Sequence, residues 1–232
     1  MESAQERSKA VIPNRASEPV FVFLAYLFAQ FVVLSAGEHF PGDNPLLVAA
    51  IFSTFSAALG AVAAGLWIDR ANGHQFVGRI NPRIDQLMAC VGAGFAAGLV
   101  VYFLTSVFPN AGSADPMLAK AFLDKGPAIL LGWMVTILVV APIGEEMVFR
   151  GAIQGHLARR VGSSASVVVS ALLFLLIHMP QLGGYWPAML AIFGLGVTAG
   201  IARVKTRSLL GAIVTHVSYN SVMMIFVITG NF

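Results

Sequence analysis

Seven apolar runs dominate this 232-residue chain, and they restrict its fold more than any other feature. A helix that crosses a bilayer needs about 20 mostly apolar residues. These runs are long and unalternating, unlike barrel strands, and only helices can then satisfy every backbone amide in lipid. The sequence therefore predicts an all-α fold, a polytopic transmembrane bundle of about seven helices. The predicted spans are 19–37, 45–68, 86–108, 126–150, 163–179, 185–202 and 208–229.

The composition agrees with a membrane protein, because 57% of the residues are hydrophobic and 11% are charged. A typical soluble domain has about 25% charged residues. Cys90 is the only cysteine, which excludes a disulfide framework and a cysteine-based metal site. Two small-xxx-small pairs, Gly94 with Gly98 and Gly196 with Gly200, predict close contacts between helices.

The basic residues predict the orientation of the bundle. Twelve of the 14 Lys and Arg residues fall on one side of the predicted spans, whereas Lys120 and Lys125 fall on the other. The positive-inside rule then places the N-terminus in the cytoplasm and the C-terminus outside, as expected for a multi-pass protein of the cell membrane. Because the charges are scattered singly among loops, they do not indicate nucleic-acid binding. The twelve are Arg7, Lys9, Arg15, Arg70, Arg79, Arg83, Arg150, Arg159, Arg160, Arg203, Lys205 and Arg207.

An acidic pair follows Pro142 inside the fourth run, although charged groups at membrane depth are costly and usually mark a site or an internal pair. Glu146 and Arg150 are four residues apart, so they share a helix face and are expected to pair. Glu145 lies about 100° around the helix and need not share that partner. One carboxylate is then structural and the other is available as a general base. Pro142 lacks an N–H and should loosen the helix just before the pair.

Two histidine clusters lie in later runs, Phe174 with His178 and His216 with Asn220, each at a spacing of four. The fourth helix is expected to continue through Arg160, and the chain to turn back near 161–162. Glu145 and His178 are each about 16 residues from that turn, so an antiparallel hairpin places them opposite one another. A Glu and a His within reach of each other could activate one water. His216 and Asn220 could donate to an oxyanion.

Each cluster also has a plainer explanation when it is taken alone. The acids could form a buried salt network, His178 could be a hydrogen-bonded residue at a span end, and His216 with Asn220 could link helices. The three clusters together favour a single hydrolytic site. The basic segment that contains His156, Arg159 and Arg160 favours a cavity that faces the cytoplasm.

These clusters resemble the CPBP family of intramembrane proteases, which includes CAAX prenyl protease 2 and Abi-like bacteriocin-processing proteins. The family pattern is EExxxR, FxxxH and HxxxN or HxxxD on successive helices, and all three motifs are present in order. The resemblance covers roughly 126–229. It predicts a CPBP-like catalytic core at 126–229, preceded by a cytoplasmic tail at 1–18 and N-terminal transmembrane helices at 19–125.

The resemblance implies a glutamate-dependent endopeptidase that cuts within or beside the membrane. It assigns Glu145 and His178 to water activation and His216 and Asn220 to the oxyanion. Glu146 and Arg150 would support them, in agreement with the helix-face argument. The expected partners are the lipid bilayer and a peptide or protein substrate, and whether that substrate is prenylated stays open.

No cofactor is expected, because the chain lacks HExxH and a carboxamide would be an unusual metal ligand. The alternative is a zinc ion held by Glu145, His178 and His216, since three protein ligands plus water form a catalytic site. Two other functions remain alternatives. A proton-coupled transporter could use the same buried Glu and His residues as a relay, and a membrane scaffold could contain them without catalysis.

Overall fold

The computed structural model of the chain describes residues 17–40, 44–72, 77–79, 81–108 and 125–229. Within these ranges the protein is a bundle of helices without β-strands, and one isolated bridge joins Gly78 to Ser208. The main helices are α1 (Ser17–Ser35), α2 (Pro45–Asn72), α3 (Ile84–Val107), α8 (Ser163–Leu182), α9 (Trp186–Thr206) and α10 (Leu209–Thr229). A short 3₁₀ turn, η2 (Gly37–His39), follows α1.

The fourth span consists of five consecutive helical segments. They are α5 (Pro127–Val135), η3 (Thr136–Val140), α6 (Ala141–Glu146), η4 (Met147–Ile153) and α7 (Gln154–Val161). The segments η3 and η4 are π-helical, and they lie on either side of α6. The loosening that the sequence predicts near Pro142 is therefore present as a wider helical turn, and a second one follows the acidic pair.

In the part of the chain that the structure describes, seven helical segments are long and apolar enough to cross a membrane, which confirms the predicted fold class. The fourth extends from Pro127 to Val161, so the predicted continuation through Arg160 is confirmed. Gly162 then adopts a positive φ of 81° and reverses the chain into α8. This is the expected hairpin between the fourth and fifth spans. The tail at 1–18 falls mostly outside the described residues, and the division into three domains stays a prediction.

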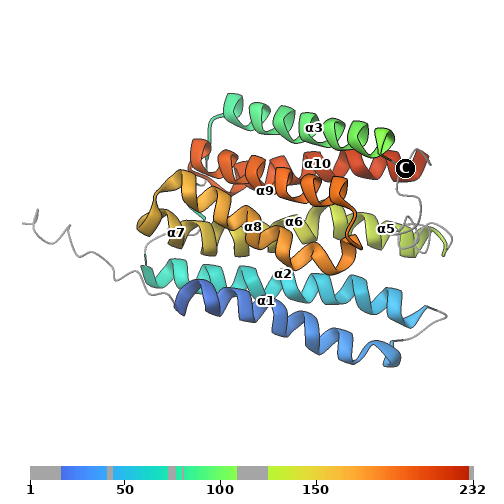
Figure 1. Ribbon diagram of the computed structural model, residues 1–232. Helices are drawn as coiled ribbons and strands as arrows, with labels where there is room; N and C mark the ends of the chain where they lie inside the picture. The colour runs from blue at the N-terminus through green and yellow to red at the C-terminus, as the bar shows by residue number, and fades with distance from the viewer. Residues whose placement is uncertain (1–16, 41–43, 73–76, 80, 109–124, 230–232) are drawn as a thin grey trace, which may run out of the picture.

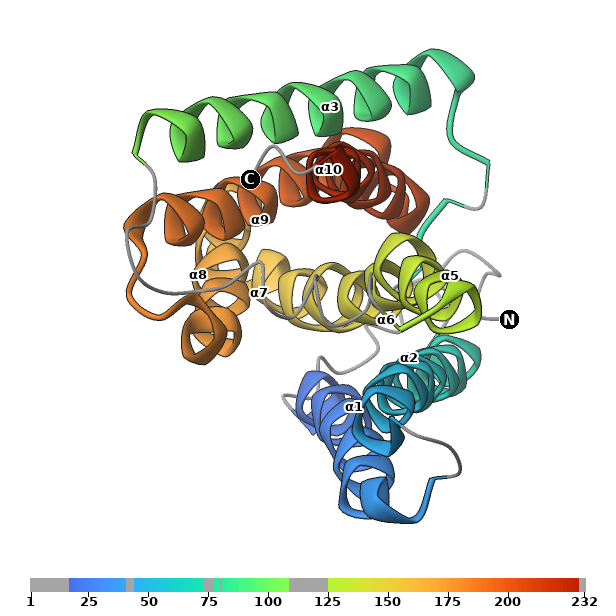
Figure 2. The same cartoon turned by 90° about the vertical axis from the view of Figure 1, so that its right-hand side faces the viewer.

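The helices are arranged in layers around the fourth span. Figure 1 shows them side by side along one axis, and Figure 2 looks along the bundle from the end where α5 begins. The pair α1 and α2 packs on one side, with α2 against α6 and η4. On the other side α10 packs against α6 and α9, and α3 covers α9 and α10. The acidic pair therefore lies at the centre of the molecule.

Small residues allow the helices to approach closely, as the two glycine pairs predict. A Cβ atom on Gly94 would lie 2.2 Å from the Thr215 carbonyl oxygen of α10, and one on Gly98 would lie 2.8 Å from Val222 Cβ. In α9, a Cβ atom on Gly196 would lie 2.9 Å from Ala171 Cβ of α8. These contacts hold α10 and α8 in place, and both helices carry histidines of the predicted site.

Candidate active site

Glu146 and Arg150 form the buried ion pair that their spacing predicts. Arg150 Nη1 donates to Glu146 Oε1 at 2.9 Å, and both side chains are fully buried. Arg150 Nη2 donates to the carbonyl oxygen of Gly196 in α9 at 3.0 Å. The guanidinium carbon also lies 4.8 Å from the centre of the Phe174 ring. The pair therefore ties the fourth span to α8 and α9.

His216 lies between the two acids. Its Nδ1 is 2.8 Å from Glu146 Oε1, and its Nε2 is 3.8 Å from Glu145 Oε2. The ionised Glu146 carboxylate has no hydrogen to donate, and it already accepts one from Arg150. Nδ1 of His216 is therefore the donor and carries the hydrogen. In a neutral ring Nε2 is then an acceptor, and in the protonated ring it becomes a donor beside Glu145. The sequence does not reveal the contact between His216 and Glu146, because these residues are 70 positions apart.

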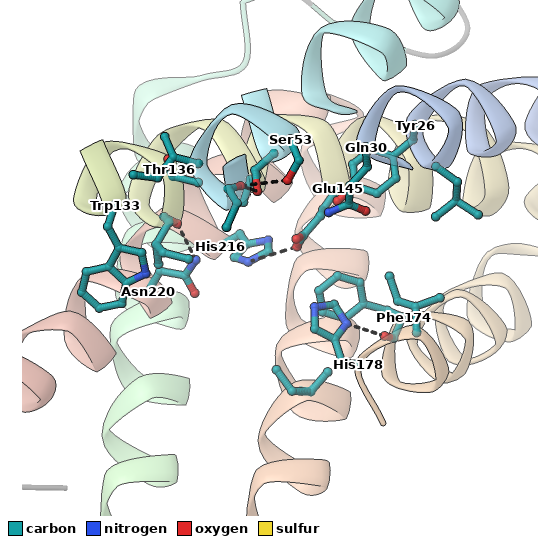
Figure 3. Close-up of a pocket in the computed structure, with 18 of the residues that line it drawn as sticks. Tyr26, Gln30, Ser53, Trp133, Thr136, Glu145, Phe174, His178, His216 and Asn220 are labelled. Atoms are coloured by element: carbon teal, nitrogen blue, oxygen red, sulfur yellow. Dashed lines mark hydrogen bonds and ion pairs between the residues drawn. The ribbon is translucent and has the colours of Figure 1, made fainter. Parts of the chain in front are cut away.

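Glu145 has a different environment from its neighbour. Its side chain is 13% exposed, whereas that of Glu146 is completely buried. In Figure 3 the Glu145 carboxylate points toward the His216 ring, and His178 lies across the cavity from it. The two adjacent acids therefore lie in different environments. Glu146 is in the packed core, and Glu145 lines a cavity with room for water or substrate.

His178 is oriented by its own helix. Its Nδ1 is 2.7 Å from the Phe174 carbonyl oxygen one turn earlier. A carbonyl oxygen only accepts, so Nδ1 is the donor and Nε2 of the neutral ring has a free lone pair. The Phe174 ring lies 4.5 Å from the His178 ring and 5.9 Å from the His216 ring, measured between centres. Phe174 therefore packs against both imidazoles, a role that spacing within one helix could not reveal.

Asn220 is anchored by a carbonyl oxygen that the π turn makes available. The backbone N–H of Ala141 bonds to the Thr136 carbonyl instead of the Ile137 carbonyl, and Pro142 has no N–H to offer. Asn220 Nδ2 donates to the Ile137 carbonyl at 2.8 Å. The amide has two N–H donors, so one remains for another acceptor. Pro142 thus helps to fix a side chain on α10.

One cavity of about 560 Å³ collects the four predicted catalytic side chains, Glu145, His178, His216 and Asn220. They come from three separate spans, α6, α8 and α10 (Figure 3). Glu146 and Arg150 do not line the cavity and lie behind its wall. The rest of the lining is Tyr26, Leu27, Gln30, Leu34, Ala50, Ile51, Ser53, Thr54, Trp133, Thr136, Ile137, Ala141, Phe174, Ile177, Ile192 and Leu195.

Other helices contribute further polar residues to this cavity, and the sequence motifs do not include them. Gln30 comes from α1, Ser53 and Thr54 come from α2, and Thr136 comes from η3. Gln30 is a long polar side chain within an apolar run, which is a signal that could have been noticed. The hydroxyls of Ser53 and Thr54 bond to the Ala50 carbonyl oxygen of their own helix. Ser and Thr are often accommodated in this way within helices, so their presence in an apolar run does not indicate a site.

The cavity extends along the bundle from the middle of the fourth span toward its start. Its lining comes from the later part of α1, the first turns of α2, the first half of the fourth span and the later part of α8. Arg159 and Arg160 lie at the other end of the fourth span. The middle of the span is packed, with Glu146 to Ala152 buried, and the expectation of a cavity that faces the cytoplasm stays a prediction.

The zinc alternative requires Glu145, His178 and His216 to lie close enough together to share one metal ion. Within the described ranges no three His, Cys, Asp or Glu side chains are grouped closely enough to hold a metal ion. His178 lines the same cavity as Glu145 and His216, but its Nδ1 is engaged with the Phe174 carbonyl oxygen.

Comparison with known proteins finds a family match for the part of the chain that contains Glu145, His178, His216 and Asn220. A protein from Escherichia coli, described as "Uncharacterized 24.3 kDa protein", is 24% identical over 151 residues, which cover 62% of this chain and 68% of that protein. No solved structure matches the chain. Residues 127–222 match the family described as Type II CAAX prenyl endopeptidase Rce1-like. This segment contains all three motifs, and its match to that family is consistent with the resemblance to the CPBP family.

Proposed function

We propose that this chain is an intramembrane endopeptidase that hydrolyses a peptide bond with a water activated by Glu145 and His178. The observation that supports it most is the convergence of Glu145, His178, His216 and Asn220 on one cavity. The family of residues 127–222 consists of proteases, which supports peptide hydrolysis as the reaction. The substrate would be a peptide or protein in or beside the bilayer.

In the proposed reaction, one water sits between the Glu145 carboxylate and Nε2 of His178. Glu145 accepts a proton as the water oxygen attacks the carbonyl carbon of the scissile bond. The C–N bond of the tetrahedral intermediate then breaks, and the proton passes from Glu145 to the departing amine. The hydrogen bond from His178 Nδ1 to Phe174 keeps Nε2 unprotonated and directed to the water.

His216 and Asn220 would stabilise the negative oxygen of the intermediate. Asn220 has a second amide hydrogen beyond the one that it gives to Ile137. His216 can donate from Nε2 only when its ring is doubly protonated, and that cation would lie between Glu145 and Glu146. Donors already fixed in place avoid reorganisation as charge develops. Arg150 and Glu146 would therefore act by positioning His216.

Glu145→Gln tests the proposal, because the amide keeps the shape of the carboxylate and cannot accept the proton. We expect cleavage of a peptide library by the purified protein in proteoliposomes to fall by about 10²–10⁴-fold, with thermal unfolding unchanged. Glu18→Gln, at the start of α1 and outside the cavity lining, is the matched control. Undiminished cleavage by Glu145→Gln contradicts the mechanism. Peptides retained by this variant, identified by mass spectrometry, would define the substrate.

The same variant separates the protease from the two alternatives. A proton-coupled transporter predicts proton flux into proteoliposomes containing a pH-sensitive dye, with no new peptide ends. A scaffold predicts neither flux nor cleavage. Wild-type protein that produces new peptide ends, and loses them with Glu145→Gln, excludes both alternatives.

We also propose that the reaction needs no metal ion. Glu145 and His178 provide the base and its partner, and His216 is engaged with Glu146 at Nδ1. Dialysis against EDTA and 1,10-phenanthroline is then expected to leave the cleavage rate unchanged. Loss of cleavage that zinc restores would establish the zinc alternative, in which Nε2 of His216 and His178 would be ligands.

A further inference from the structure

Helix α1 supplies part of the wall of the catalytic cavity, although it lies outside the family match at residues 127–222. Four residues of α1 line the cavity, and they are Tyr26, Leu27, Gln30 and Leu34. Their spacings of three and four residues place them along one face of the helix. Both polar members of this face, Tyr26 and Gln30, are drawn in Figure 3 with the catalytic side chains.

Close packing against α2 fixes the position of this face. Ser56 Oγ of α2 donates to the Ala29 carbonyl oxygen of α1 at 2.6 Å. A Cβ atom on Gly60 would lie 3.0 Å from the Ala25 carbonyl oxygen, so the two helices approach closely there. The helix α1 also packs against η4, the turn that follows the acidic pair. The cavity-facing side chains of α1 are therefore held at a fixed place beside the site.

Tyr26 and Gln30 make no hydrogen bond to any residue that the structure describes. Three other side chains of the lining already donate their hydroxyl to a carbonyl oxygen one turn earlier, and they are Ser53, Thr54 and Thr136. Tyr26 is only 6% exposed, and its phenol is close enough to Glu145 to interact with it electrostatically. A polar group without a partner is costly to bury, and a bound molecule could provide the missing partners.

The spacing of these two side chains matches the main chain of an extended peptide. Tyr26 and Gln30 are four residues apart, which is a rise of about 6 Å along α1. In an extended peptide, main-chain groups that point the same way recur every two residues, about 6.6 Å apart. The phenol can donate to a carbonyl oxygen, and the amide can both donate and accept. Main-chain groups of a peptide need such partners once water is excluded.

We propose that the substrate binds as an extended segment along α1, with Tyr26 and Gln30 hydrogen-bonded to alternate main-chain groups. The inference rests on the proposed function, because it concerns how the same cavity holds its peptide. Since Tyr26 interacts with Glu145, a peptide bound in this way has its main chain close to the proposed base. Hydrogen bonds to the main chain do not depend on which side chains the peptide has at these positions.

Binding to the Glu145→Gln protein tests the proposal without any turnover. The probe is a fluorescein-labelled peptide that this variant retains from the library, and fluorescence anisotropy in nanodiscs gives its Kd. Addition of Gln30→Met or Tyr26→Phe should weaken binding by about 3–10-fold each, because each removes hydrogen-bonding groups and keeps most of the shape. Ser35→Ala and Tyr102→Phe, outside the cavity lining, are the matched controls and should leave Kd unchanged.

Ester-substituted versions of the same peptide identify the main-chain groups that are bound. An ester removes one N–H and weakens one carbonyl oxygen as an acceptor, while the side chains and the protein stay the same. Two esters, two residues apart, should each weaken binding to the Glu145→Gln protein by about 3–10-fold. One should have no further effect after Gln30→Met, and the other should have none after Tyr26→Phe.

Four outcomes separate this proposal from the proposed function. Unchanged Kd values for both α1 variants, or ester effects that are the same in every variant, overturn binding along α1. Wild-type cleavage of the peptide alongside either of these results leaves the proposed function intact. Binding that depends on Tyr26 and Gln30, without cleavage by the wild type, contradicts only the proposed function. A Glu145→Gln protein that retains no peptide from the library contradicts both.

Discussion

The adjacent carboxylates of Glu145 and Glu146 belong to the same helix but lie in different chemical environments. Glu146 accepts hydrogen bonds from Arg150 and His216 and has no exposed surface. Glu145 contacts His216 at 3.8 Å and faces the cavity. A step of one residue turns a side chain by about 100°, which suffices to move a carboxylate from a packed interior to a cavity wall. The sequence could predict this division because it depends only on local helix geometry.

Arg150 should be the most important single residue for stability at the site. Arg150→Ala leaves the Glu146 carboxylate buried without its ion-pair partner, which typically costs about 3–5 kcal/mol in the free energy of unfolding. Thermal unfolding in detergent measures the loss. Arg160→Ala, an exposed arginine of the same span, is the control and should stay within about 0.5 kcal/mol of wild type.

A double variant separates the lost charge balance from lost packing. Glu146→Gln with Arg150→Met removes both charges, keeps an acceptor for His216 and fills the space with an apolar chain. Replacing both members of a buried pair is often nearly neutral, so this variant should unfold closer to wild type than Arg150→Ala does. If Arg150→Ala alone unfolds like wild type, the pair does not stabilise the bundle.

Asn220→Ala should affect catalysis more than folding. Loss of one oxyanion donor lowers kcat by about 10²–10³-fold, whereas loss of the hydrogen bond to Ile137 costs about 1 kcal/mol of stability. Rates and unfolding are measured on the same preparation. Ser221→Ala removes a hydroxyl that bonds to the Val217 carbonyl oxygen of its own helix, so it serves as the matched control. A raised KM with unchanged kcat would assign Asn220 to substrate binding instead.

At the scale of elements, the fourth span owes its site geometry to its irregular turns. The sequence predicts a weak point at Pro142 because a proline cannot donate a backbone hydrogen bond. It does not predict that η3 releases the Ile137 carbonyl, or that Asn220 from α10 then bonds to it. Those contacts depend on how two distant helices pack. A pattern of residues within one helix therefore reveals the faces of that helix but not its partners.

A pair of glycines in α3 tests the close packing of helices. Gly94→Ala adds a Cβ atom 2.2 Å from the Thr215 carbonyl oxygen, so α3 and α10 must separate. Overpacking of this kind typically destabilises by about 1–3 kcal/mol. Gly92→Ala meets nothing within 4 Å and gains helix propensity, so its unfolding temperature should not fall. Equal unfolding temperatures of the two variants contradict the observed contact between α3 and α10.

At the scale of the whole molecule, composition and run length were enough to predict the seven spans and the all-α bundle. These properties depend on the solvent, because lipid leaves a long apolar segment few alternatives to a helix. The position of the cavity was not predictable in the same way. It depends on which end of the bundle is filled by Phe149, Phe174 and the Glu146–Arg150 pair, and their contacts join residues from different spans. The sequence thus predicted the residues of the site better than the shape of the cavity around them.

The orientation of the whole bundle can be measured with reporters at the two chain ends. Seven spans place the ends on opposite sides of the membrane, and 12 of 14 Lys and Arg residues predict which end is inside. Alkaline phosphatase fused after Phe232 should be active because it folds outside, while green fluorescent protein at that position should be dark. The same fluorescent protein fused before Met1 should be bright. Both ends on one side would require an even number of spans, and a full reversal would mean that the basic loops face outward despite their charge.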